Sequence, residues 1–148
     1  DLEGLELAAA CDIRLITPKA TIALPEAGVG IVPGWSGSQR LARLIPEGMV
    51  KEMALFGRRI GADRLLSCGF VAEIAEDVRT AAQEIAAKAA TLSPRATEIT
   101  KAMIHAGQGE DSAALIEALG SAAISASADR QEGVAAFHQK RKAEFPGT

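Results

Sequence analysis

The chain has 148 residues, a hydrophobic content of 48% and a formal net charge of −3, which allow one domain with an apolar core. The acidic balance and the lack of a basic stripe with interleaved aromatic residues argue against a nucleic-acid partner. No window of about 18 apolar residues and no signal-peptide pattern occur, so we expect a cytoplasmic protein with no membrane partner.

The first half alternates short apolar segments with turn residues. Small and apolar residues predict a buried helix from Gly4 to about Cys11, and two short strands follow at Asp12–Ile16 and Thr21–Leu24, with Pro18 at the turn between them. A glycine-rich loop, AGVGIVPGWSGSQRL, then leads into a helix predicted from about Ser38 to Ile45. Backbone N–H groups can face a ligand in such a loop.

The second half is dominated by helical periodicity. Helices are predicted at Gly48–Phe56 and Ala62–Cys68, and a strand at Phe70–Ile74. Alanine-rich amphipathic segments follow at Asp77–Thr91, Pro94–Ala106 and Asp111–Ala128, and a fourth, charged helix is predicted at Asp129–Phe145.

This change of texture divides the chain into an α/β portion, residues 1–76, and an all-helical tail, residues 77–148. The α/β portion contains too few short strands to form a sheet that covers its helices. We therefore expect that an upstream part of the same fold is missing from this chain.

The cysteines and histidines give no metal-ligand pattern. Cys11 and Cys68 lie far apart in apolar helical contexts, which favours reduced, buried thiols. His105 and His138 are isolated and are interpreted as helix-surface or cap residues. We expect neither a disulfide nor a metal site.

Two glutamates are candidates for chemistry. Glu6 lies among alanines and leucines, where an unpaired carboxylate is costly, and Glu26 follows a strand and Pro25. Taken singly, Glu6 is also explained by the helix dipole and Glu26 by a solvated turn. Together they predict one cleft in which two carboxyl groups act as acid and base.

Two other interpretations use the glycine-rich loop. Residues 34–38, GWSGS, approach the Gly-x-Ser-x-Gly nucleophile elbow of hydrolases, with Ser36 as nucleophile and His105 and His138 as bases, but the fifth position is Ser and Pro33 stands where a strand should end. Gly28 and Gly30 form a GxG of the dinucleotide-binding kind, but proline replaces the third glycine. Both patterns are incomplete.

Three segments carry a family resemblance: GLELAAACDIRLITPKATIALPEAGVGIVPGWSGSQRLARLI, KEMALFGRRIGADRLLSCGFVAEI and DRQEGVAAFHQKRKAEF. In order and spacing they resemble the C-terminal portion of the enoyl-CoA hydratase/isomerase (crotonase) superfamily. The resemblance implies an α/β fold, a crotonase-like spiral of ββα turns followed by a helical trimerisation tail. It also implies a homotrimer or hexamer that binds an acyl-CoA thioester.

The same resemblance assigns roles to the site residues. Glu6 matches the glutamate that activates water, and Glu26 matches the one that delivers a proton to the alpha carbon. Hydration places negative charge on the thioester oxygen, and backbone N–H groups at a helix N-terminus can stabilise it. The oxyanion donor position falls at Glu3, where the family has glycine, beside the retained Gly4.

Substrate contacts are implied at two further places. Pro33, Gly34 and Trp35 match the family's loop beside the bound water, where Trp35 replaces a small residue and could reshape the acyl pocket. Lys140 and Lys142 fall where tail residues approach the nucleotide end of CoA in a neighbouring subunit; a solvated helix end explains them equally well. No separate cofactor is expected, because coenzyme A is part of the substrate.

The sequence thus predicts an enoyl-CoA hydratase-like lyase that adds water in syn fashion to a trans-2-enoyl-CoA. Another crotonase-type enzyme (isomerase, decarboxylase or dehalogenase) and an inactive assembly module are the alternatives. The missing N-terminal half of the domain leaves three explanations: a fragment, a separate polypeptide that supplies the other half, or a degenerate relative.

Overall fold

The structure of the protein is a computed structural model that describes residues 2–34, 37–93, 97, 99–101, 104–105, 122 and 124–146. Most of the segments predicted as helices at Pro94–Ala106 and Asp111–Ala128 lie outside the described residues. Among the residues that are described, no helix is both long and apolar enough to cross a membrane.

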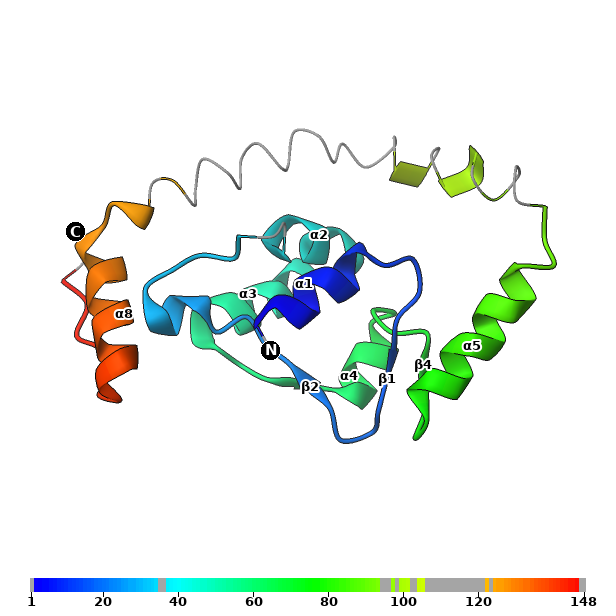
Figure 1. Ribbon diagram of the computed structural model, residues 1–148, viewed down its shortest axis with the longest axis horizontal. Coiled ribbons are helices and arrows are strands. Elements are labelled where there is room, and N and C mark those ends of the chain that lie inside the picture. The colour runs from blue at the N-terminus through cyan, green and yellow to red at the C-terminus, as the bar shows by residue number, and fades with distance from the viewer. Residues whose placement is uncertain are drawn as a thin grey trace.

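Helices form most of the described structure (Figure 1). They are α1 (Leu2–Ala10), the 3₁₀ helix η1 (Glu26–Val29), α2 (Gly37–Leu44), α3 (Glu47–Phe56), α4 (Ala62–Ser67), α5 (Val78–Ala89) and α8 (Ala128–Gln139). The strands are β1 (Leu15–Ile16), β2 (Thr21–Ile22), β3 (Ile60–Gly61) and β4 (Glu73–Ile74). The helices predicted around α1 to α5 are confirmed within a few residues at each end.

The strands form two small sheets rather than one. β1 pairs with β4 in parallel, with Leu15 opposite Glu73, and β2 pairs with β3 antiparallel, with Thr21 opposite Gly61. β3 was not predicted, because a two-residue strand gives no alternating pattern of its own. Parallel pairing of β1 with β4 requires the intervening helices as a crossover connection.

The core lies between α1, α2, α3, α4 and the strands. Its fully buried side chains are Leu24, Leu41, Met53, Ile60 and Leu65. On α3, Met49, Val50 and Met53 lie on one face at helical spacing, which is why this short helix packs inward. The α/β portion predicted for residues 1–76 therefore has a shared apolar core.

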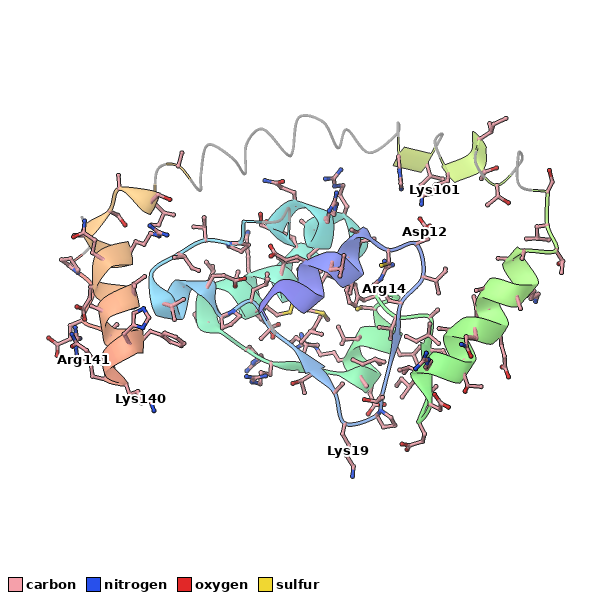
Figure 2. The ribbon with its side chains drawn as sticks, in the orientation of Figure 1. Asp12, Arg14, Lys19, Lys101, Lys140 and Arg141 are labelled. Atoms are coloured by element: carbon pink, nitrogen blue, oxygen red, sulfur yellow. The ribbon has the colours of Figure 1, made fainter. Side chains whose placement is uncertain are left out.

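Arg14 fastens the end of α1 to the segment before β4. Its Nε donates to the Phe70 carbonyl at 2.6 Å, and Nη1 donates to the Cys11 carbonyl just beyond α1. The guanidinium carbon also lies 5.0 Å from the centroid of the Phe70 ring, a cation–π arrangement (Figure 2). One side chain thus joins residues far apart in sequence.

Helices α5 and α8 lie on opposite sides of the core (Figure 1). α5 begins at the N-cap Asp77, whose carboxylate accepts hydrogen bonds from the Thr80 hydroxyl and from the backbone N–H groups of Thr80 and Arg79; these bonds lower the pKa of Asp77. α8, at the other end, packs against η1.

Three sequence expectations need correction. The helix predicted at Asp129–Phe145 ends at Gln139, because Lys140 takes a left-handed conformation with φ of 53°. The strand predicted at Phe70–Ile74 is confined to Glu73–Ile74. Neither thiol is buried as expected: Cys11, which follows the last turn of α1, is exposed, and Cys68, the C-cap of α4, is half-buried.

Adjacent leucines on α4 test the assignment of the core. Leu65 is 0% exposed and Leu66 is 43% exposed. Leu65→Ala should lower the free energy of unfolding by about 2–5 kcal/mol, because it removes buried methyl groups and leaves a cavity. Leu66→Ala, the matched control, should cost less than about 1 kcal/mol in the same denaturant titration; equal losses would contradict the packing.

Candidate active site

Glu6 is held inside the core by the helix that carries it. It lies in the second turn of α1, between the buried residues Leu5 and Ala9, and is 5% exposed. Its Oε1 accepts a hydrogen bond from the backbone N–H of Gly37 at 3.2 Å. Gly37 is the first residue of α2, so the carboxylate lies at a helix N-terminus, which favours negative charge.

Gly37 has a structural role that the sequence analysis did not assign. A Cβ at this position would lie 2.5 Å from Glu6 Oε1 and 2.8 Å from its Cγ. The absence of a side chain is therefore what lets the carboxylate reach the end of α2. A glycine that directly precedes a predicted helix was the only signal available in the sequence.

Glu26 is the second buried carboxyl group of the described structure. It is the first residue of η1 and is 5% exposed, so its interpretation as a solvated turn residue is wrong. Its Oε2 has no hydrogen-bond partner among the described residues. A buried, unpartnered carboxylate oxygen is rare in a purely structural role and is typical of a site that meets a ligand.

The environment of Glu26 favours its protonated form. Burial raises the pKa of Glu26, its own backbone N–H lowers it, and the charge of Glu6 raises it again. The two carboxyl groups, which come from α1 and η1, are thus close enough to interact electrostatically. Neutral Glu26 can donate a proton, whereas the polar contact at Glu6 suits an ionised base.

The other residues predicted for the site belong to α1 or to the connection between η1 and α2. Gly4 is an exposed residue of α1, and Glu3 is part of the same helix. Pro33 and Gly34 lie in the connection between η1 and α2, half-buried and exposed respectively. The predicted Trp35 lies outside the described residues, as does Ser36.

The predicted CoA contacts follow α8: Lys140, labelled in Figure 2, is its C-cap, and Lys142 lies two residues further on. Lys140 and Lys142 are both exposed. Between them, Arg141 forms an ion pair with Glu132, and this contact lowers the pKa of Glu132 to about 2. Both lysines are thus exposed, whereas Glu6 and Glu26 are buried.

An open apolar hollow of about 810 Å³ is bordered by α1, which carries Glu6, and by Pro25, the residue before η1. Gly4 and Leu5 of α1 and Pro25, which precedes η1, line it, together with residues of β1 and β2. Glu6 and Glu26 themselves are not among its lining residues. The carboxyl groups thus lie behind the wall of the hollow.

The two rival patterns fit the structure poorly. A nucleophile elbow needs a strand directly before it, but residues 31–34 form no strand. Gly28 and Gly30 belong to η1 and its C-cap rather than to a strand-to-helix turn. Within the described residues, no three His, Cys, Asp or Glu side chains gather as metal ligands would.

Comparison with known proteins decides the family. The sequence pattern of the family described as enoyl-CoA hydratase/isomerase matches residues 3–148. The chain belongs to the enoyl-CoA hydratase/isomerase family. Among its relatives, two curated proteins resemble this chain across nearly all of its length.

These relatives are described as hydratases. A crotonyl-CoA hydratase of Syntrophomonas wolfei is 36% identical over 146 residues, which cover 96% of this chain and 56% of that protein. A short-chain-enoyl-CoA hydratase of Clostridium acetobutylicum is 35% identical over 145 residues, with coverage of 95% and 56%. The chain therefore spans about half the length of the curated relatives it matches.

Solved structures of the family agree with the fold. An enoyl-CoA hydratase/isomerase from Pseudoalteromonas atlantica matches with a TM-score of 0.86 at 30% identity, covering 97% of this chain and 59% of that one. A carnitinyl-CoA dehydratase from Mycobacterium avium gives a TM-score of 0.91 at 24% identity, with coverage of 98% and 59%, and shows the fold alone. The chain has a mixed α/β, crotonase-like fold, mostly helical with small sheets.

Burial of Glu26 predicts a specific pH dependence of stability. Because its pKa is raised in the folded state, the protonated carboxyl supports folding below the ordinary value of 4.5, and this support is lost as pH rises through the raised pKa. Glu26→Gln should therefore be more stable than the wild type at pH 7, with a difference that disappears below pH 4, measured by thermal unfolding across pH.

Glu47→Gln is the matched control for that series. Glu47 is exposed and its hydrogen bond with Lys51 lowers its pKa. Glu47→Gln should therefore be as stable as the wild type at pH 7, or less stable. A Glu26→Gln protein that is less stable than the wild type at pH 7 would show that the ionised carboxylate is well accommodated.

Proposed function

We propose that the protein to which this chain belongs is an enoyl-CoA hydratase-like lyase that adds water in syn fashion to a trans-2-enoyl-CoA. The observation that carries the proposal is the pair of buried carboxyl groups, Glu6 and Glu26, whose charges interact and one of which has an unpartnered oxygen. Hydratases among the relatives support the same choice of reaction.

The proposed mechanism uses the two carboxyl groups in opposite roles. Ionised Glu6, held by the Gly37 N–H, accepts a proton from a water molecule whose oxygen bonds to the β-carbon. The electron pair of the double bond moves toward the thioester, and protonated Glu26 delivers its proton to the α-carbon. The raised pKa of Glu26 suits the acid role because it keeps the proton available at higher pH.

Stabilisation of the thioester oxygen is proposed for the start of α1. The backbone N–H groups of Glu3 and Gly4, both in α1, are the proposed donors. Each donor aimed at the developing oxyanion is worth about 10²- to 10³-fold in rate. A carboxylate at Glu3 opposes negative charge nearby, which is the feature that favours an inactive relative as the alternative.

Substrate contacts complete the proposal. Pro33, Gly34 and Trp35 would border the acyl group and water, and Lys140 and Lys142 would approach the nucleotide end of CoA in a neighbouring subunit of a homotrimer or hexamer. Exposure of both lysines is compatible with a contact to another subunit. Isomerase, decarboxylase or dehalogenase chemistry on the same enolate is the second alternative.

We further propose that the chain is the C-terminal portion of a crotonase spiral. Residues 1–76 would complete the spiral core and residues 77–148 would form the oligomerisation tail. Coverage of little more than half of each relative supports this division, as does the apolar hollow bordered by β1 and β2, which offers a face for further strands.

Substitution of each glutamate tests the assigned roles. In the complete protein, Glu6→Gln and Glu26→Gln should each slow hydration of crotonyl-CoA by about 10²- to 10⁴-fold, because an amide neither accepts nor donates the required proton. The loss of the enone absorbance measures the rate, and KM should change little. Near-normal turnover by either variant would refute the role of that residue.

A second experiment tests whether the chain is a portion of the active unit. The 148-residue chain alone should show no hydration of crotonyl-CoA, because the proposed division leaves the thioester cleft to be completed by the rest of the spiral. The complete protein in the same assay is the positive control. Measurable turnover by the chain alone would overturn the proposed division.

A further inference from the structure

Two glycines bring α8 into backbone contact with η1, the turn that carries Glu26. A Cβ on Gly133 of α8 would lie 2.0 Å from the Val29 carbonyl oxygen, and a Cβ on Gly30 would lie 2.3 Å from the Asp129 carbonyl oxygen. Since real Cβ atoms do not approach so closely, both positions accept only glycine in this arrangement. Asp129 and Gly133 lie one turn apart on the same face of α8.

Small residues form the whole buried face of α8. Gly133 and Ala136 are its buried residues, whereas Val134 and Phe137 are exposed. This face therefore buries little apolar area. Its small residues instead let the backbone of α8 come close to the backbone of η1. Figure 1 shows α8 beside the light-blue turn that contains η1.

The chain after α8 folds back onto the same turn. Glu132 receives two hydrogen bonds from the Arg141 guanidinium and one from the backbone N–H of Glu144 at 2.8 Å. This contact directs the chain so that Phe145 Cε1 lies 3.1 Å from the Cβ position of Gly30. Gly30 is thus enclosed by α8 on one side and by the returning segment, residues 140–145, on the other.

Such support matters because η1 has little stability of its own. It is a 3₁₀ turn of four residues whose bonds include Gly30 N–H and Ile31 N–H to backbone carbonyls of the turn. Among the described residues, the Oε2 of Glu26 has no hydrogen-bond partner that could fix the side chain independently. The direction of Glu26 therefore depends on the backbone of η1.

We propose that α8 and the returning segment position Glu26 by clamping η1 through Gly30 and Gly133, so that Gly133 is a positioning residue for proton delivery. This inference rests on the proposed hydration reaction. It assigns to the end of the helical tail a function within its own chain, separate from any subunit contact.

Gly133→Ala is the decisive substitution. In a helix alanine is more favourable than glycine, so without the contact this change would raise the melting temperature. With the contact it should lower the melting temperature and speed hydrogen exchange of the Gly30 and Ile31 amides at least tenfold, while core amides such as that of Leu41 stay protected. These two readouts need no activity and can be made on this chain.

Two glycines with free space serve as controls. Gly48 lies in α3 and Gly28 in η1 itself, and a Cβ at either position meets no atom within 4 Å. Gly48→Ala should raise or preserve the melting temperature, and Gly28→Ala should leave exchange of the η1 amides unchanged. If Gly133→Ala behaves like these controls, the clamp does not exist.

The activity readout separates positioning from folding. In the complete protein, Gly133→Ala should lower kcat for crotonyl-CoA about 10- to 100-fold, the scale expected for a small displacement of a reacting group, with less than a threefold change in KM. Gly48→Ala should retain normal kcat. Faster amide exchange with normal kcat would overturn the positioning role, whereas normal turnover by Glu26→Gln would refute the hydration proposal itself.

Glu132→Gln gives a milder second test if Gly133→Ala fails to fold. It removes the charge that holds Arg141 and Glu144 but leaves every glycine in place. Exchange of the Gly30 amide should accelerate and kcat should fall in the same direction by a smaller factor. Unchanged exchange and unchanged kcat would count against the clamp.

Discussion

The hydrogen bond from the Gly37 N–H to the Glu6 carboxylate constrains the centre of the molecule. It gives the buried Glu6 carboxylate a backbone donor that has no acceptor within α2, at the N-terminus of that helix. Because no side chain separates the two groups, α1 and α2 must approach closely at this point. The burial of Leu41 on α2 and of Leu5 on α1 follows from that approach.

The second carboxyl group is arranged in the opposite way. Glu26 is buried on a short turn, one of its oxygens has no hydrogen-bond partner in the part of the chain that the structure describes, and burial together with the charge of Glu6 raises its pKa. Such a group weakens the folded state when it ionises, so its presence is explained by chemistry rather than by stability. The burial of apolar side chains in the core formed by α1 to α4 offsets this loss of stability.

Local sequence patterns predicted the helices but not the contacts between distant segments. Apolar spacing and turn residues indicated α1, α2, α3, α4 and α5, whereas β3 depends on pairing with β2, and the end of α8 depends on a left-handed Lys140 where glycine is usual. The burial of Glu26 could not be read from its place after a strand, because it results from packing.

The sequence contexts of Glu6, among apolar residues, and of Glu26, after a strand, made them candidates, and the family resemblance assigned their separate roles. The roles of Gly37, Gly30 and Gly133 were beyond sequence reasoning for a single physical reason. Each glycine is required by a carbonyl or carboxylate oxygen from another element, and a single sequence does not show that oxygen.

The Arg14 contact with Phe70 has a consequence for how the protein folds. The two residues are separated by 56 positions, and their contact closes a loop that contains η1 and α2 to α4. Closing so long a loop costs chain entropy before β1 and β4 can pair, so folding should be slower than the high helix content suggests. During synthesis, Arg14 can therefore make this contact only after the residues beyond β3 have been made.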